Sequence, residues 1–394
     1  MANPETKSVV DWLVDGARSA QDAPGAVAEL CERLCRCGIP LWRGAVFVRT
    51  LHPQVIGRRL MWRADSGVEV TEAPHEMIET AYFRDSPIAY VFATGQKLRR
   101  RLGDPACPLD FPVLRDFRAE GITDYIATPL IFTDGAVHAA TWTTRQDGGF
   151  TLEQAAAIEG IIAPLARVAE VRALRRTAAN LLDTYVGHHA GERILAGGIR
   201  RGDTESIDAA IWLSDMRGFT ARADHLPPHD LIRLLNRYFD CQVPAIVDHG
   251  GEVLNFMGDG LLAIFRFAAD GADAGEVCAR ALAAALAARK NIVALGRAAG
   301  ADEIGGVAFG LALHLGNVLY GNIGGGNRLD FTCIGPAVNM AARIEKLAGT
   351  LGRSILASSD FARQSGAGLV AVGEFALAGF QQPQKMFGLP EEGV

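Results

Sequence analysis

Residues 250–265 read GGEVLNFMGDGLLAIF, and this stretch decides the fold of the C-terminal half of the chain. Two apolar runs, Glu252 to Phe256 and Leu261 to Phe267, are joined by Met257-Gly258-Asp259-Gly260. An Asp-Gly pair between apolar runs is typical of a tight hairpin turn. The stretch therefore predicts a β-hairpin with the carboxylate of Asp259 at its tip, although an Asp-Gly pair alone indicates only a turn.

A second carboxylate follows an earlier apolar run. Residues 207–214 predict a strand that ends at Asp215, after which Gly218 begins a turn into the helical pattern from Leu226 to Phe239. Two aspartates on neighbouring strands supply the oxygen ligands of a two-metal phosphoryl-transfer site. The backbone amides between Met216 and Thr220, close to a helix N-terminus, would suit phosphate oxygens. An isolated aspartate at a strand end is more often a cap.

Polar residues also occur at helical spacing farther along the chain. Residues 306–324 predict a pair of strands that meet around Gly316-Asn317. Another strand follows, and then a helix from about Pro336, a residue suited to the first helical turn. Asn339 and Arg343 are four residues apart on this helix and so share one of its faces. Such a pair is commonly a solvated surface, and by itself it indicates little.

Taken together, these segments form a specific pattern. They occur in the order SDMRGFT (214–220), GGEVLNFMGDGLLAIF (250–265), GLALHLGNVLYGNIG (310–324) and RLDFTCIGPAVNMAARIE (328–345). This order closely resembles the class III adenylate and guanylate cyclases, from Ala209 to about Leu389. The resemblance implies an α/β (α+β) fold, with a ferredoxin-like catalytic domain that dimerises head to tail. Each active site would then be shared between two subunits of a homodimer.

The resemblance also implies roles for single residues. Asp215 and Asp259 correspond to the two metal-binding aspartates, and Met216 to a residue whose backbone carbonyl binds metal. The cofactors would be two Mg²⁺ or Mn²⁺ ions per active site, which can activate the ribose 3′-hydroxyl and neutralise the triphosphate. Asn339 and Arg343 correspond to the catalytic helix residues that orient the ribose and stabilise the charged transition state from the other subunit.

Substrate binding is expected at Asn255 and Thr332 for the base, and at Phe219 and Thr220 for the phosphates. Related adenylate cyclases usually have lysine at the Asn255 position, whereas guanylate cyclases commonly have glutamate. An asparagine amide carries both a donor and an acceptor and can serve either purine. Because Thr332 matches the adenine-reading pattern, we expect ATP as substrate, with GTP as the alternative. Ala378 replaces a frequent basic residue that contacts the triphosphate, which predicts a raised KM.

A hypothesis from another functional class stays open at this point. A degenerate cyclase domain could be retained as a nucleotide-binding regulatory module or a dimerisation module. Asn255 and Ala378 favour that reading. The two aspartates and the Asn339/Arg343 pair oppose it, because a decayed site is expected to lose at least one of these groups.

The N-terminal part, residues 1–160, predicts a separate α+β domain. The runs 125–132 and 136–143 indicate a hairpin, and Thr151 with Gln154 indicates a capping box that opens a helix. This hairpin and helix resemble the end of a GAF-type sensor domain. The resemblance implies an unknown small ligand or signal that regulates the catalytic domain.

Residues 161–203 predict a helical connector to the catalytic domain, residues 204–394. Apolar residues recur there at steps of three and four, which suits either a coiled-coil seam or an amphipathic helix packed on its own domain. The seam would contain Leu165, Val168, Val171, Leu174, Ala178, Leu181 and Tyr185.

Composition limits the setting in which the protein works. The 394 residues allow two or three domains, and 49% hydrophobic with 21% charged residues is ordinary globular usage. A net charge of -6 without basic runs argues against nucleic-acid partners, and no run of about 20 apolar residues predicts a membrane span. We therefore expect a cytoplasmic protein. Cys31, Cys35 and Cys37 cluster, which permits a soft-metal or redox role, although small buried side chains are the commoner reading.

Overall fold

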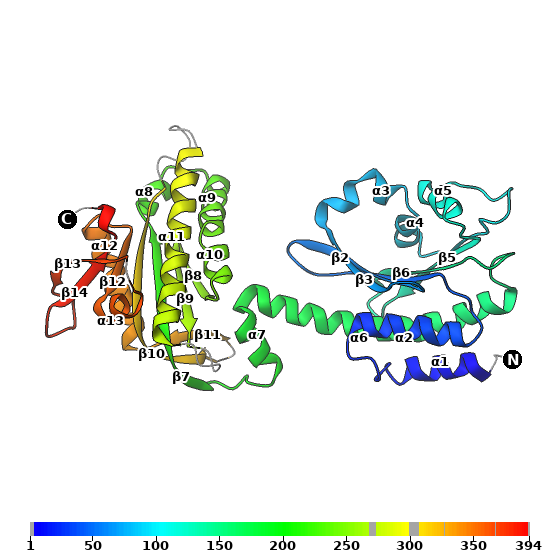
Figure 1. Cartoon of the computed structure of the whole chain (residues 1–394), viewed down its shortest axis with the longest axis horizontal. Coiled ribbons are helices and arrows are strands. Elements are labelled where there is room, and N and C mark those ends of the chain that lie inside the picture. Colours follow the sequence, from blue (N-terminus) through cyan, green and yellow to red (C-terminus); the bar gives the residue numbers. More distant parts are fainter. Residues whose placement is uncertain (1–3, 268–272, 299–306, 327, 367, 393–394) are drawn as a thin grey trace. The chain divides into compact units, whose positions relative to one another are not determined.

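The computed structural model describes residues 4–267, 273–298, 307–326, 328–366 and 368–392 (Figure 1). The chain divides into two compact units, Met1–Leu181 and Leu182–Val394. This boundary lies inside residues 161–203, the segment that the sequence predicts as a connector.

An antiparallel six-stranded sheet organises the first unit, with the strand order β3-β2-β1-β6-β5-β4. The strands are β1 (Arg43–Arg49), β2 (Val55–Arg63), β3 (Gly67–Pro74), β4 (Leu98–Arg100), β5 (Asp124–Ile131) and β6 (Val137–Thr144). β5 and β6 pair from Asp124 with Thr144 to Ile131 with Val137, which confirms the predicted hairpin. The edge strand β3 lacks a sequence signal because most of its side chains are exposed.

Helices cover both faces of this sheet. The apolar cluster on one face involves α1 (Pro4–Val14), α2 (Ala23–Arg36) and α6 (Leu152–Val186). The other face packs against α4 (Pro87–Thr94) and α5 (Pro112–Ala119), which follow η1 (His75–Glu79) and α3 (Ala81–Arg84). The capping box before α6 is confirmed, since Gln154 N donates to Thr151 Oγ1 at 3.1 Å and Thr151 N donates to Gln154 Oε1 at 3.0 Å.

The predicted apolar seam of α6 divides between two environments. Leu165 and Val168 are buried in the core of the first unit. Val171, Leu174 and Tyr185 are 50%, 62% and 78% exposed. The early seam residues therefore hold the helix on its own sheet, and the later ones form an exposed apolar stripe. Within the described segments, no helix is long and apolar enough to cross a membrane.

The second unit is built on a sheet whose centre has the order β10-β7-β9-β8. These strands are β7 (Thr204–Met216), β8 (Glu252–Met257), β9 (Gly260–Arg266) and β10 (Phe309–Gly325). Helices α9 (Pro228–Asp240) and α10 (Val243–Asp248) connect β7 to β8, and α11 (Ala274–Ala298) stands between β9 and β10. This βαββαβ order with antiparallel neighbours is ferredoxin-like, as predicted.

Further elements extend this core. β12 (Ile355–Ser358), β14 (Gln384–Gly388) and β13 (Val370–Phe375) continue the sheet beyond β10, and β11 (Arg328–Ile334) pairs with one end of β10. The remaining elements are α7 (His188–Leu195), α8 (Phe219–Ala223), α12 (Pro336–Thr350), α13 (Ser359–Gln364) and η2 (Pro390–Glu392).

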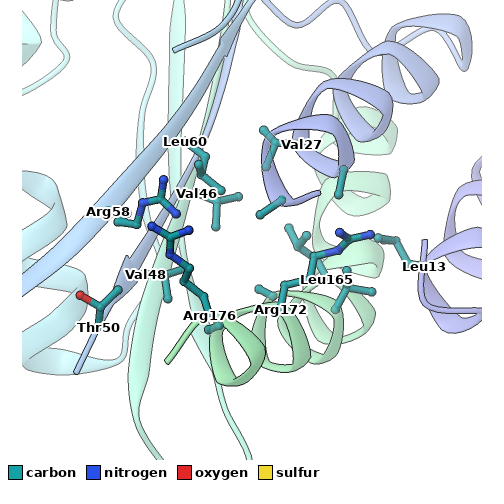
Figure 2. Close-up of a pocket in the computed structure, with 15 residues that line it drawn as sticks. Leu13, Val27, Val46, Val48, Thr50, Arg58, Leu60, Leu165, Arg172 and Arg176 are labelled. Carbon is teal, nitrogen blue, oxygen red and sulfur yellow. The ribbon is translucent and has the colours of Figure 1, made fainter. Parts of the chain in front are cut away.

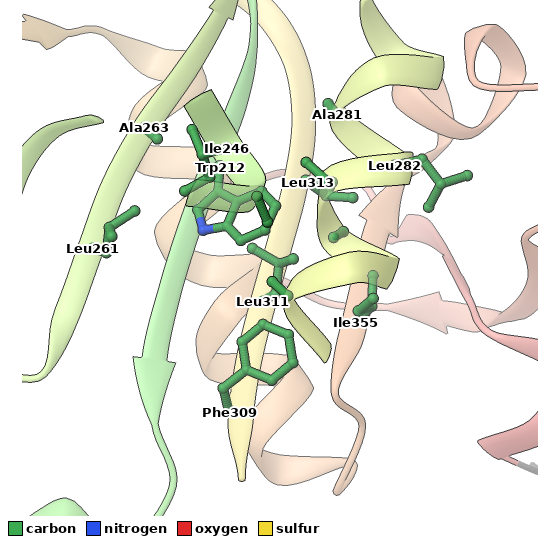
Figure 3. Packing of buried hydrophobic residues seen from close by; sticks show 14 of the residues in the cluster. Trp212, Ile246, Leu261, Ala263, Ala281, Leu282, Phe309, Leu311, Leu313 and Ile355 are labelled. Atoms are coloured by element: carbon green, nitrogen blue, oxygen red, sulfur yellow. The ribbon is translucent and has the colours of Figure 1, made fainter. Parts of the chain in front are cut away.

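Both faces of the central strands are buried. Trp212 of β7 packs with Phe309 and Ile246 beneath α10 and α11 (Figure 3). Its neighbours Ile211 and Leu213 point the other way, into the cluster under α12. The sequence of a strand that is buried on both faces is typically a continuous run of apolar residues. The charged side chains of β7, Glu205, Asp208 and Asp215, consequently lie on either side of its buried apolar run 209–213.

The prediction that two strands meet at Gly316-Asn317 is wrong. β10 is one continuous strand, and Gly316 pairs with Ala209 of β7 in an unbroken register. The glycine serves close packing, because a Cβ atom at Gly316 would lie 2.7 Å from the Cβ of Ala337 on α12. A glycine that allows a helix to approach a strand looks like a turn residue in the sequence.

Gly316→Ala tests this packing. We expect it to destabilise the second unit by about 1–3 kcal/mol, because α12 must move away from β10. Gly325→Ala on the same strand is the matched control, since a Cβ there meets no atom within 4 Å. Calorimetric melting of both variants checks the expectation, and equal melting temperatures would contradict it.

Candidate active site

The hairpin at residues 250–265 forms as predicted and presents Asp259. Met257 pairs with Gly260, which leaves Gly258 and Asp259 as a two-residue turn. Gly258 has a φ angle of +66°, in the left-handed region that favours glycine. The turn therefore fixes Asp259 at the end of two apolar strands.

Asp215 lies beside this turn. β7 and β9 pair up to Ser214 and Leu261, so the end of β7 reaches the hairpin tip. The side chains of Asp215 and Asp259 share a hydrogen bond. Burial, the hydrogen bond to Asp259 and the negative charge of Asp259 together raise the pKa of Asp215 to about 7. Two carboxylates this close repel each other once both are ionised, and a cation between them relieves the repulsion.

The donor set fits Mg²⁺ or Mn²⁺. Both cations prefer oxygen ligands, and Mg²⁺ commonly takes one or two carboxylates together with substrate phosphates and water. Among the described residues, no group of three or more His, Cys, Asp or Glu side chains could hold a metal ion by itself. Asp215 and Asp259 would therefore hold the ions jointly with a phosphorylated ligand. The side chain of Met216 is buried in the core, so only its backbone is suited to this role.

A short helix starts four residues after Asp215. Gly218, with a φ angle of +70°, turns the chain, and Phe219 and Thr220 are the first residues of α8. Phe219 packs partly into the core, whereas Thr220 is exposed. The first N–H groups of a helix have no partner within it. The backbone here can therefore offer donors close to the two carboxylates.

Asn255 and Thr332 lie next to each other on β8 and β11. Asn255 Nδ2 donates a hydrogen bond to Thr332 Oγ1 at 2.9 Å. A β-bulge between Val253 and Asn255 inserts an extra residue into β8. Such a bulge shifts the alternation of side chains, and bulges are common next to active sites. The sequence pattern gave no sign of it.

Asn339 and Arg343 share a face of α12, as predicted. Arg343 Nη1 donates to the carbonyl oxygen of Asn339 at 2.9 Å. The guanidinium also lies 5.7 Å from the ring centroid of Phe380 and borders Gly379. Within the described part of this chain, no interaction joins Asn339 or Arg343 to the two aspartates. Ala378, which precedes Gly379, is exposed.

The family of this unit follows from a direct match. Residues 203–388 match the family model of the adenylate and guanylate cyclase catalytic domain. The second unit is a class III nucleotide cyclase domain. This match covers the two carboxylates, the Asn255/Thr332 pair and α12.

Individual relatives resemble the cyclase domain. An uncharacterized protein of Mycobacterium tuberculosis is 32% identical over 207 residues, which are 51% of this chain and 37% of that protein. An adenylate cyclase of Anabaena cylindrica is 32% identical over 157 residues, 39% of this chain and 30% of that protein. The chain thus matches about a third of the length of these relatives. Among solved structures, the adenylyl cyclase CyaB from P. aeruginosa has 27% identity and a TM-score of 0.43, over 47% of this chain and 95% of that one.

An ion pair that the sequence did not reveal joins two parts of the cyclase domain. Arg217 Nη1 donates to Glu345 Oε1 at 2.7 Å, which connects the end of β7 to α12. Gly310 leaves room for it, since a Cβ there would lie 1.4 Å from Arg217 Nη2. Burial raises the pKa of Glu345 even though Arg217 opposes the shift. Spacing cannot predict a pair whose members stand 128 positions apart.

Helix α7 is anchored to β8, the strand that carries Asn255. Tyr320 Oη lies 3.0 Å from both carboxylate oxygens of Glu252, and the backbone of Ala190 in α7 also bonds to this carboxylate. Burial raises the pKa of Glu252. Glu252 stands three residues before Asn255 on β8. A displacement of α7 would therefore act on the strand that carries Asn255.

Among the described residues, Cys31, Cys35 and Cys37 form no group that could hold a metal ion. Cys31 lies fully inside the apolar core, and burial raises the pKa of its thiol well above the usual value. Cys35 is partly buried, and its thiol pKa is also raised. These thiols pack as small apolar side chains.

Asp259→Asn tests the repulsion between the two carboxylates. At pH 8, above the pKa of Asp215, the neutral amide removes a negative charge, so we expect the metal-free variant to melt about 2–4 °C higher. Mn²⁺ should stabilise the unaltered protein and leave this variant unchanged. The control is Asp248→Asn, an exposed carboxylate at the end of α10. A Mn²⁺ response in Asp259→Asn equal to that of the control would refute the assignment.

Proposed function

We propose that this protein is an adenylate cyclase that converts ATP to 3′,5′-cyclic AMP and pyrophosphate at a homodimer interface. The observation that carries the proposal is the pair of adjacent carboxylates at Asp215 and Asp259, placed by β7 and the hairpin of a cyclase domain. An adenylate cyclase of Anabaena cylindrica among the relatives supports the choice of reaction.

Each part of the site has a task in this reaction. Asp215 and Asp259 hold the divalent ions, which, when bound, lower the pKa of the ribose 3′-hydroxyl and neutralise the triphosphate. Backbone N–H groups at the start of α8 hold phosphate oxygens. Asn339 orients the ribose, and the guanidinium of Arg343 stabilises negative charge as pyrophosphate leaves. Phe380 and the carbonyl oxygen of Asn339 hold the guanidinium of Arg343 in position.

A homodimer accounts for the separation of these groups. Arg343 has no interaction with the aspartates among the described residues of its own chain, so a second copy would supply it to a shared site. The exposed apolar stripe of Val171, Leu174 and Tyr185 on α6 offers an additional surface for a second copy. Coiled-coil pairing of such stripes is a common route to dimers.

The base-binding pair favours ATP. Because Asn255 uses an N–H to bond Thr332, its Oδ1 remains an acceptor and the Thr332 hydroxyl keeps a proton to donate. An acceptor beside a donor matches the amino group and ring nitrogen of adenine. Guanine needs the reverse order, which an amide rotation would supply, so GTP is the second candidate.

We also propose that the first unit acts as a GAF-like sensor that regulates the cyclase domain.

The degenerate module is the competing function. Its specific support is Ala378, which leaves no basic side chain at a position expected to contact the triphosphate. A pure binding module would bind nucleotide without releasing pyrophosphate. The activity assay below separates the two functions.

The first prediction of the proposal concerns activity. The full chain with Mn²⁺ and ATP should release cyclic AMP, and Asp259→Ala should lower the rate on the order of 100-fold or more, because the ions lose a ligand. Asp248→Ala, on α10, should retain the activity. Quantifying cyclic AMP and cyclic GMP from separate ATP and GTP incubations gives the result. Nucleotide binding without either product would favour the regulatory module.

A second prediction concerns the base. Asn255→Lys should raise the ratio of kcat/KM for ATP over that for GTP on the order of tenfold or more, because a fixed donor faces the adenine ring nitrogen. Asn255→Glu is the reciprocal variant, and it should move the ratio toward GTP. If both variants shift the ratio in the same direction, the pair does not read the base.

A further inference from the structure

The first unit contains a cavity on the face of its sheet that α1, α2 and α6 cover. The space between these elements amounts to about 690 Å³ when the volume that is open to solvent is included. Leu13 of α1, Val27 of α2, Val46 of β1, Leu60 of β2 and Leu165 of α6 line its interior (Figure 2). The interior is therefore suited to an alkyl chain or a similar apolar group.

One end of this cavity is cationic. Arg58 of β2 and Arg176 of α6 point toward each other there (Figure 2). Arg58 Nε lies 3.2 Å from Glu72 Oε1, within ion-pair distance, but its N–H is buried without a hydrogen-bond acceptor among the described residues. Arg176 makes no hydrogen bond or ion pair with any residue that the structure describes. Two guanidinium groups at the mouth thus retain donors for a ligand.

The charge at this mouth matches a single negative charge. Two guanidinium charges and the one carboxylate of Glu72 leave a net charge of +1. Planar guanidinium groups bind carboxylates through paired N–H donors. Arg172 is not part of this mouth, since its Nη2 donates to the carbonyl oxygens of Ala17 and Ala20. It forms part of the wall at the other end of the cavity.

We infer that this cavity binds an amphipathic monoanion, an alkyl chain that carries one carboxylate. The chain would lie among the apolar residues beneath α6, and the carboxylate would bond to Arg58 and Arg176. This binding does not depend on the proposed cyclase activity, because every residue involved belongs to the first unit.

The opposite face of α6 leaves the cavity free in a dimer. The α6 residues that line the cavity include Leu165, Arg172 and Arg176. At about 100° per residue, the exposed residues Val171 and Leu174 point to the other side of the helix. A second copy that packs on this stripe would not cover the cavity.

The experiment measures binding of dodecanoate to the full chain by titration calorimetry, below the concentration at which dodecanoate forms micelles. Arg176→Gln should weaken binding on the order of tenfold, because one charge-assisted pair is lost. The matched control is Arg175→Gln, since Arg175 is the exposed neighbour on α6 that does not line the cavity. Decanoate should bind on the order of tenfold more weakly than dodecanoate.

Two further arms test the tail and the head. Ala173→Phe should abolish binding by filling the cavity, whereas Ala178→Phe, at an exposed position of the same helix, should not. Dodecyltrimethylammonium, a cation with the same chain, should not bind. The inference is overturned if dodecanoate fails to bind, if Arg175→Gln and Arg176→Gln weaken it equally, or if the cationic amphiphile binds as well. Tighter binding of dodecyl phosphate would overturn the choice of a carboxylate.

Discussion

Two carboxylates that share a hydrogen bond at the end of β7 are the constraint on which the cyclase domain depends. Holding Asp215 close to Asp259 has a cost in the metal-free chain, since burial and the negative charge of Asp259 both disfavour the ionised form of Asp215. The arrangement becomes favourable when a cation binds between them. The turn at Gly258 and the pairing of β7 with β9 keep the two groups close in the absence of that cation. The site is therefore preorganised, and the packing of the surrounding sheet offsets the free-energy cost of holding the carboxylates together.

The double-sided burial of the sheet explains why the site lies where it does. Trp212 on one face and Ile211 on the other are buried in the middle of β7, and the carboxylate of Asp215 lies beyond this buried run, at the end of the strand. The Arg217–Glu345 ion pair then connects this strand end to α12. Helix α12, which carries Arg343, and the end of β7, which carries Asp215, are therefore joined directly within the domain.

The sequence predicts correctly those elements whose signals lie in residues close together in the chain. The hairpin around Asp259, the capping box at Thr151 and the shared face of Asn339 and Arg343 all depend on neighbours within four residues. It failed at Gly316, where the cause is contact with a helix that comes later in the chain. The bulge before Asn255 and the Arg217–Glu345 pair were out of reach for the same reason, because tertiary packing decides them.

Helix α6 carries two different surfaces along one segment. Its inner face, near Leu165 and Arg176, closes the cavity, while Val171 and Leu174 are exposed on the other side. A ligand that bonds to Arg176 would restrain the side chains of α6 and favour one position of the helix on the sheet. Since a ligand can shift an equilibrium only by its differential affinity for two states, the cavity must differ between those states. A ligand carboxylate that bonds to both Arg58 of β2 and Arg176 of α6 would supply that difference. It can bond to both only when β2 and α6 lie at the separation that places the two guanidinium groups within reach of one carboxylate.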